Sequence, residues 1–278
     1  MPNSSFTLGA VRDPNDQRDY RIRDHVHQAA APSVVDYEAQ MSAVKDQGNR
    51  GSCVAHGACA VKEWQEAHQR GFEKEFDLSE EWLYHLIALP DGGAYPRDVM
   101  KALARYGVCE EKRMPYDKKK SDISEVYSTS LHLPMRERHE VMRRNRRMLG
   151  DARKYRCGPY VRLRTIDELK EAAANAGPLL IGIPWFDGWY NTRGKTQYDG
   201  YPILKWGDGN IVGRHLVAIA GYQEFNRITD ILTKFKNSWN TRWGKNGYAY
   251  FLDDIFDHFN SLDIWAMYDQ HNPLILET

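Results

Sequence analysis

The sequence has few cysteines, and they lack the spacing of a disulfide framework. Four occur among the 278 residues, at Cys53, Cys59, Cys109 and Cys157, and no two form a Cys-x-x-Cys pair. Domains held together by disulfides carry denser and more regular sets. We therefore expect a fold that does not depend on disulfides and that suits a reducing compartment.

The chain also lacks an apolar leader, a membrane-spanning run and an excess of either charge. Its first 30 residues are polar and charged, so we expect no signal peptide. No apolar run approaches the length of a transmembrane helix. Lys plus Arg equal Asp plus Glu at 38 each, so no global charge points to nucleic acid or a membrane surface. We expect a cytoplasmic location, with export by a route that uses no signal peptide left open.

Metal-ligand spacing is missing as well. The ten histidines show no His-x-x-x-His pattern and no pairing with cysteines, so we predict no metal site and no cofactor. Hydrophobic residues make up 42% of the chain, which is enough core for one large or two modest domains.

One segment around a cysteine has the pattern of a loop that leads into a helix. Gln47, Gly48 and Gly51 mark a sharply bent backbone before Cys53. The helix is expected to run from a Ser52 cap to about residue 70 and to stop at the glycine that follows. A cysteine in the first turn meets free N–H groups that favour a thiolate. Because most free cysteines are simply buried, this segment alone does not identify a nucleophile.

The hydrophobic patterns divide the chain into four parts. Residues 1–31 form a polar arm, a possible short prosegment that covers the active-site groove or packs beside it, with a free tail as the alternative. Residues 32–116 are mainly helical and carry the cysteine. Residues 117–158 are a basic insertion, and residues 159–278 are rich in strands. Helices followed by strands predict an α+β protein in two lobes.

The basic insertion has two interpretations. Its segment 136–147 reads as a basic helix, which suits contact with an acidic partner or nucleic acid. The alternative is a solvated insertion whose charge is balanced elsewhere. No aromatic residues interleave the basic helix, so we favour the solvated insertion and expect no nucleic-acid partner.

A histidine and an asparagine in the strand-rich part complete a set of catalytic types. His215 heads an apolar strand, and Asn237 ends the next one. Adjacent antiparallel strands would place the two side chains together. A cysteine nucleophile needs an imidazole to move its proton and an amide to orient the ring. Gln47 offers a side-chain NH₂ as an oxyanion donor close to Cys53.

These motifs, in this order, resemble the papain-like cysteine peptidases. The matching segments are Gln47-Gly48-x-x-Gly51-Ser52-Cys53, Gly213–Tyr222, Lys236-Asn237-Ser238-Trp239 and Trp243–Tyr248. The resemblance implies a papain-like two-lobed α+β fold. Its helical left lobe and antiparallel β-barrel-like right lobe would enclose the active-site groove. The few cysteines and short arm are similar to prokaryotic members of that family.

The resemblance also implies catalytic roles for four residues. Cys53 would be the nucleophile, and His215 its base and then acid. Asn237 would orient His215. Gln47 and the backbone N–H of Cys53 would form the oxyanion hole.

Three further residues would bind substrate or protect the site. Gly92 and Gly93 would present backbone groups to an extended peptide. Trp239 would shield the bond between His215 and Asn237 from water.

The sequence departs from the family near the nucleophile. Arg50 replaces a cysteine that the family ties in a disulfide, and Val54 replaces an aromatic residue. His56 stands where the family has an apolar aromatic, and it is either an alternative base or, as we favour, a buried and hydrogen-bonded histidine.

The function predicted is that of a cysteine endopeptidase acting through a thioester acyl-enzyme, as a monomer, on a peptide or protein substrate. Two alternatives stay open. The same thioester could pass its acyl group to an amine, as in an acyltransferase or transamidase. A non-catalytic peptide-binding module would keep the groove alone.

Overall fold

The computed structural model describes residues 6–20, 31–119, 146–225 and 231–269. Most of the predicted basic helix at 136–147 lies outside these ranges. Within them, no helix is long and apolar enough to cross a membrane. The described residues also contain no group of three or more His, Cys, Asp or Glu side chains that could hold a metal ion.

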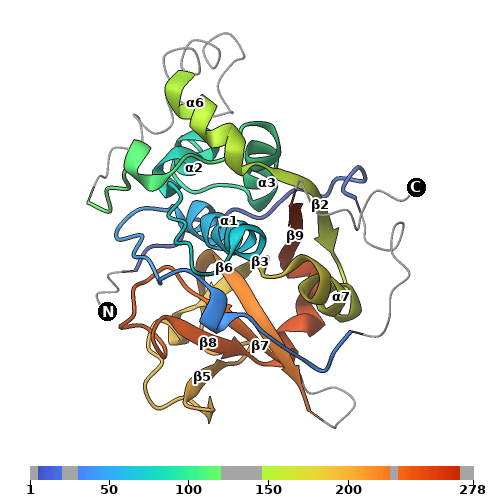
Figure 1. The fold of residues 1–278 in the computed structure, drawn as a ribbon. Coiled ribbons are helices and arrows are strands. Elements are labelled where there is room, and N and C mark those ends of the chain that lie inside the picture. The colour runs from blue at the N-terminus through green and yellow to red at the C-terminus, as the bar shows by residue number, and fades with distance from the viewer. Residues whose placement is uncertain (1–5, 21–30, 120–145, 226–230, 270–278) are drawn as a thin grey trace.

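Helices gather in the upper half of the molecule in Figure 1, with the first of them at the centre. They are α1 (Cys53–Arg70), α2 (Glu80–Ile87), α3 (Pro96–Arg105), α6 (Arg146–Ala152) and α7 (Ile166–Ala176). Short 3₁₀ turns span Glu38–Gln40, Glu111–Arg113, Arg153–Tyr155, Asp187–Trp189 and Asp253–Ser261. Only α7 lies apart from the others, against the sheet.

The strands form one mixed, mostly antiparallel sheet. They are β1 (Val34–Asp36), β2 (Cys157–Leu163), β3 (Leu179–Phe186), β4 (Gln197–Tyr198), β5 (Tyr201–Leu204), β6 (Ile211–Glu224), β7 (Ile231–Lys236), β8 (Tyr248–Phe251) and β9 (Asp263–Asp269). Their order is β2-β9-β3-β6-β7-β8-β5-β4, with β1 paired to β6. The β5–β8 pair is parallel. The sheet stays open, so the α+β prediction is confirmed but the barrel-like lobe is not closed.

Helix α1 has the predicted limits, but its cap differs from the prediction. The Ser52 side chain makes no capping hydrogen bond. Its Oγ instead lies 2.6 Å from the hydroxyl oxygen of Tyr116. Side chains cap α2 and α7: the Ser79 hydroxyl accepts from the N–H of Trp82, and the Thr165 hydroxyl from that of Glu168.

The sequence did not predict four of the strands, β2, β4, β5 and β9, and one predicted strand is longer than expected. Strands β2 and β9 pair with each other along one side of the sheet. Strand β6 begins at Ile211, so His215 lies inside it and not at its head. The extension follows from pairing with β3, whose register joins Ile183 to His215 and Phe186 to Ile211.

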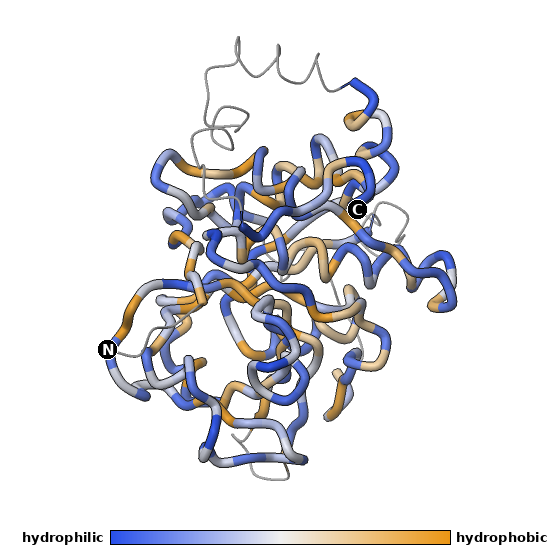
Figure 2. The backbone as a smooth tube through the Cα atoms, turned by 90° about the vertical axis from the view of Figure 1, so that its left-hand side faces the viewer, coloured by the Kyte–Doolittle hydropathy of each residue, from blue (hydrophilic) through white to orange (hydrophobic). Residues whose placement is uncertain are grey.

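Helix α1 is the element on which the two halves meet. All its residues from Cys53 to Ala67 are buried, because helices cover one side and the sheet covers the other. Figure 2 shows apolar segments running through the middle of the molecule, while outlying loops are mostly hydrophilic. At Gly57 a Cβ would come within 2.4 Å of Leu216 Cδ2, so glycine permits the close approach of α1 to β6.

An ion pair fastens the loop before α1 to α2. Arg50 is 5% exposed and binds Glu81 through both terminal nitrogens, with Nη2 3.0 Å from Oε1. Its guanidinium lies over the rings of Tyr84 and Tyr116, at 5.2 and 4.8 Å from their centroids. All four cysteines are free. Arg50 therefore links the loop before α1 to α2 without a covalent bond.

We expect Arg50→Met to lower the free energy of unfolding by about 3 kcal/mol, because it removes the cationic partner of the buried Glu81 carboxylate and leaves only the contact with His85. Urea denaturation at pH 7 measures the loss. Burial raises the pKa of Glu81, but hydrogen bonds from His85 and Arg50 outweigh it and bring the pKa to about 2. The pair's contribution is therefore present above the ordinary glutamate pKa and disappears as the pH falls toward 2.

The matched control is Arg50→Met combined with Glu81→Gln. It should recover part of the loss because no charge is left unpaired. An equal loss in the single and the double variant would contradict the assigned role.

Candidate active site

Cys53 lies in the first turn of α1 with its side chain fully buried. Burial raises the pKa of the thiol to about 11, while the N–H groups of Leu216 and Gly9 near the sulfur act in the opposite direction. Leu216 directly follows His215, so the sulfur faces the histidine strand. In this arrangement the sulfur is a neutral thiol at pH 7.

His215 of β6 forms a pair with Asn237, which directly follows the neighbouring antiparallel strand β7. Asn237 Oδ1 lies 2.8 Å from His215 Nε2. As the amide oxygen accepts, Nε2 carries the proton and Nδ1 is left as the basic nitrogen. His215 Nδ1 is buried and makes no hydrogen bond within the part of the chain that the structure describes. Burial lowers the pKa of His215 to about 4, which the bond to Asn237 only partly offsets.

Aromatic rings enclose this pair. The centroid of Trp239 lies 4.5 Å from that of His215. Trp185 of β3 meets the imidazole at 4.9 Å, nearly perpendicular to it. The predicted shielding residue, Trp239, thus covers the imidazole, and Trp185 is a neighbour that the sequence did not reveal.

Gln47 holds a peptide carbonyl next to Cys53. Its Nε2 donates to the carbonyl oxygen of Thr7 at 2.9 Å and to that of Arg50 at 2.8 Å. Its Oε1 accepts from the hydroxyl of Ser238 at 2.6 Å, which fixes the orientation of the amide. The Thr7 carbonyl therefore sits on the donor that an oxyanion hole would use.

Thr7 belongs to the N-terminal arm, which crosses the site. The Phe6 ring stacks on Trp239 with centroids 4.7 Å apart. Further along, the Gly9 carbonyl accepts from the N–H of Ala94 at 2.8 Å. In Figure 1 this dark blue segment crosses between the helices above and the strands below. The arm therefore covers Cys53 and packs on both sides of it.

Glycine at position 9 is what lets the arm pass. A Cβ there would lie 2.0 Å from the carbonyl oxygen of Gly51, a backbone atom that cannot move aside. Gly93, with φ +77°, faces the arm, since its own Cβ would come within 2.5 Å of the Gly9 carbonyl oxygen. Gly92 does not face the arm; the nearest atom to its Cβ would be the hydroxyl of Tyr84. Of the two predicted glycines, only Gly93 borders the arm.

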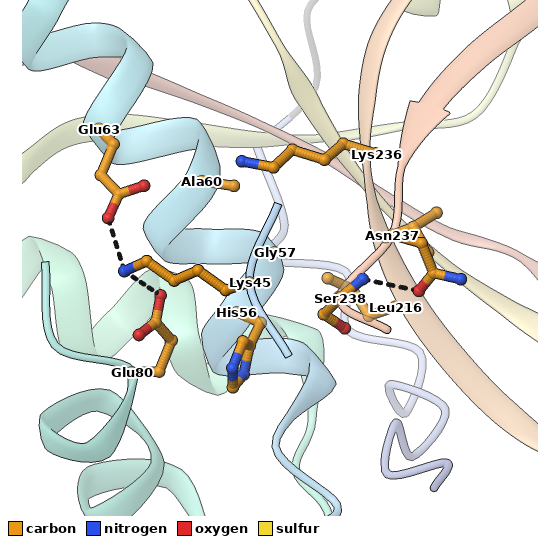
Figure 3. A pocket seen from close by; sticks show the side chains of 11 residues that line it. Lys45, His56, Gly57, Ala60, Glu63, Glu80, Leu216, Lys236, Asn237 and Ser238 are labelled. Carbon is orange, nitrogen blue, oxygen red and sulfur yellow. Dashed lines mark hydrogen bonds and ion pairs between the residues drawn. The ribbon is translucent and has the colours of Figure 1, made fainter. Parts of the chain in front are cut away.

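The histidine near the nucleophile is buried and hydrogen-bonded, as favoured from the sequence. His56 Nδ1 lies 3.1 Å from the Ser52 carbonyl oxygen, and burial lowers the pKa of the imidazole to about 3. His56 borders a pocket behind α1, shown in Figure 3, where Lys45 bridges Glu63 and Glu80 at 3.0 and 2.8 Å. Cys53 does not line that pocket, so we assign the pocket and His56 no part in the reaction.

The sequence model of papain family cysteine proteases matches residues 31–263. The chain belongs to the papain family of cysteine proteases. An uncharacterized peptidase C1-like protein of Acanthamoeba polyphaga mimivirus is 26% identical over 241 residues, or 83% of this chain and 71% of that protein. Cathepsin K of Gallus gallus is 29% identical over 230 residues, or 79% of this chain and 58% of that protein.

Solved structures support the papain-like fold. Xylellain, a cysteine protease from Xylella fastidiosa, has a TM-score of 0.72 at 23% identity, covering 94% of this chain and 96% of that one. Digestive procathepsin L 3 of the Tenebrio molitor larval midgut has a TM-score of 0.62 at 20% identity, covering 87% and 71%. The chain is thus a papain-like cysteine peptidase, while the roles of Cys53, His215, Asn237 and Gln47 stay predictions.

We expect Gly9→Ala to expose Cys53, because the added Cβ cannot fit beside Gly51. Alkylation of Cys53 by iodoacetamide, followed by peptide mass spectrometry, should be at least tenfold faster than in the unchanged chain. Gly150→Ala is the matched control, since a Cβ there meets nothing within 4 Å. Equal rates in all three proteins would mean that the arm does not protect the sulfur.

The pH dependence of alkylation should also differ. With the arm in place the thiol pKa of about 11 makes the rate climb through pH 7–10 without a plateau. Water admitted in Gly9→Ala solvates both side chains, which lowers the thiol pKa and raises that of His215. Its rate should therefore level off below about pH 8.5, the ordinary thiol pKa. Identical profiles would refute burial by the arm as the cause.

Proposed function

We propose that this papain-family protein is a cysteine endopeptidase that hydrolyses peptide bonds through a thioester acyl-enzyme. The observation that carries the proposal is the position of the Thr7 carbonyl on the Gln47 amide, next to Cys53 and the His215–Asn237 pair. These are the four groups that acyl transfer to a thiol requires.

The proposed reaction follows from these positions. His215 Nδ1 removes the thiol proton, and the Cys53 sulfur attacks the substrate carbonyl carbon. The negative oxygen that forms is stabilised by Gln47 Nε2 and the N–H of Cys53. The C–N bond then breaks, and the amine leaves with the proton held by His215. Water, deprotonated by His215, attacks the thioester and frees the acid together with the thiol.

The path of the arm favours cleavage inside a chain over trimming of an end. Residues 6–11 pass Cys53 as continuous backbone, from Trp239 on one side to Ala94 on the other. A substrate that follows this path extends in both directions from the reacting carbonyl. The arm itself presents an N–H, that of Gly9, to the sulfur. We propose that the arm is a bound inhibitory segment and not a substrate.

Transfer of the acyl group to an amine is the second candidate. It uses the same thioester, and product analysis with an added amine distinguishes it from hydrolysis. A non-catalytic binding module is the third. Failure of an epoxide that targets papain-type cysteines to label Cys53 in the Gly9→Ala protein would favour that interpretation.

The nucleophile is tested in the Gly9→Ala chain by replacing Cys53 with Ala. Hydrolysis of a panel of fluorogenic peptides should disappear, whereas Cys59→Ala, a change at another buried free cysteine of the same helix, should retain it. Persistent hydrolysis in Cys53→Ala would exclude the proposed mechanism.

The oxyanion donor gives a graded effect. In the Gly9→Ala chain, the further change Gln47→Ala should lower kcat by about 10²–10³-fold, because one donor to the developing negative charge is lost. Circular dichroism and a thermal melt check that the fold persists. An unchanged kcat in a folded variant would remove Gln47 from the oxyanion hole.

A further inference from the structure

Beyond Cys53 the arm continues over a cluster of arginines. They are Arg97 of α3, Arg162 of β2 and Arg214 of β6, and they surround Asp263 and Trp265 of β9. We call these five residues the arginine site. Arg97 and Arg162 are only 5% and 6% exposed, so the charges are largely removed from water.

The arm supplies the anions that this cluster binds. Asp19 accepts from Arg97 Nε at 2.9 Å and from Nη2 at 2.7 Å, the two-pronged geometry of a strong carboxylate contact. It also lies 3.5 Å from Arg162 Nη1. Asp13 accepts from the backbone N–H of Arg97 at 3.0 Å, at the start of α3, and from Trp265 Nε1 at 2.8 Å.

Without the arm the site has an excess of positive charge. Asp263 is the carboxylate of the protein body that pairs there, at 2.5 Å from Arg162 and 2.9 Å from Arg214. Arg97 has Asp19 as its ion-pair partner in the described residues. Three guanidinium groups would thus face one carboxylate. Arg162 Nη1 is already buried without a hydrogen bond within the described residues, so the site has an unused donor.

We propose that the arginine site binds an acidic segment of the peptide substrate once the arm has left. Three guanidinium groups then face one carboxylate, so the emptied site favours any carboxylate that can replace Asp13 and Asp19 in two-pronged contacts. The peptidase would then prefer substrates with Asp or Glu on the side of the cleaved bond that lies toward Ala94. This inference rests on the proposed function, because it describes a substrate of the same active site.

The arm also gives the spacing. Asp13 is four residues beyond Gly9, whose N–H meets the sulfur, and six beyond Thr7, whose carbonyl lies on Gln47. At about 3.3 Å per extended residue, the first carboxylate belongs roughly 13–20 Å from the cleaved bond. An acidic run that covers positions about four to six residues from that bond would reach the site.

The test uses the full chain carrying Gly9→Ala, Asp13→Ala and Asp19→Ala, in which the arm neither covers Cys53 nor fills the arginine site. Three fluorogenic peptides are compared: one with a run of three Asp four residues from the cleaved bond, one with Asn there, and one with the Asp run on the opposite side. We expect kcat/KM to be about tenfold higher than for the Asn peptide when the Asp run lies on the side toward Ala94, and unchanged when it lies on the opposite side. Equal values for all three would overturn the proposal.

Arginine variants locate the preference. Arg97→Gln should reduce the ratio of kcat/KM between the Asp and Asn peptides to less than twofold, because the two-pronged contact with the carboxylate is lost. Lys101→Gln, an exposed change on the same helix, is the matched control and should leave it intact. A preference that survives Arg97→Gln would assign the recognition to another surface.

A binding measurement separates the site from the chemistry. A synthetic peptide of residues 12–20 and its Asp→Asn counterpart are titrated against the same chain with Cys53→Ala added. The arginine site is supported if the acidic peptide binds, its Asn counterpart does not, and Arg97→Gln abolishes the binding. If these results are obtained but no peptide is hydrolysed, only the proposed function fails. If peptides are hydrolysed but the acidic peptide does not bind selectively, the role of the arginine site is rejected and the proposed peptidase function stands.

A final measurement avoids the arm substitutions altogether. In the unchanged chain, excess acidic peptide should compete with residues 12–20 of the arm and speed alkylation of Cys53 severalfold, and the Asn peptide should not. No difference between the two peptides would count against exchange at the arginine site.

Discussion

The exclusion of water from Cys53 decides the chemical state of this active site. A thiolate and an imidazolium stabilise each other only where water or fixed dipoles compensate for their burial. Here the arm removes the water, and the remaining N–H donors at the sulfur do not replace it: the thiol pKa rises to about 11 and that of His215 falls to about 4. These shifts favour the neutral form of both side chains at pH 7, so the predicted nucleophile and base carry no charge while the arm is in place.

The same constraint accounts for the polar interior around them. Arg50 enters the protein with Glu81, and Lys45 with Glu63 and Glu80, so each of these two cations has a partner of opposite sign. Such pairs add less stability than their number suggests, because both partners lose hydration. They do fix geometry, since a bidentate arginine tolerates few orientations. The loop before Cys53 is thereby held without a covalent bridge.

The sequence predicted correctly those elements whose limits are set by residues close together in the chain. Helix α1 begins at Cys53 and ends before Gly71 because helix formers lie between a glycine-rich loop and a glycine stop. The Ser52 cap was wrong because a tyrosine 64 residues away takes that hydroxyl. Strand β9 was missed because it reads as apolar residues between two aspartates, and its acidic start is neutralised by arginines from other strands. The path of the arm could not be predicted, since polar extended chain carries no periodic signal.

Gly57 limits how closely helix α1 approaches strand β6. It lies one turn along α1 from Cys53, against Leu216, the residue that follows His215. A Cβ on Gly57 would meet two leucine side chains, with Leu216 Cδ2 at 2.4 Å and Leu180 Cδ2 at 3.3 Å. A single methyl group there would press on both leucines without altering Cys53 or His215. The approach of the helix to the strand is therefore limited by a residue that has no side chain.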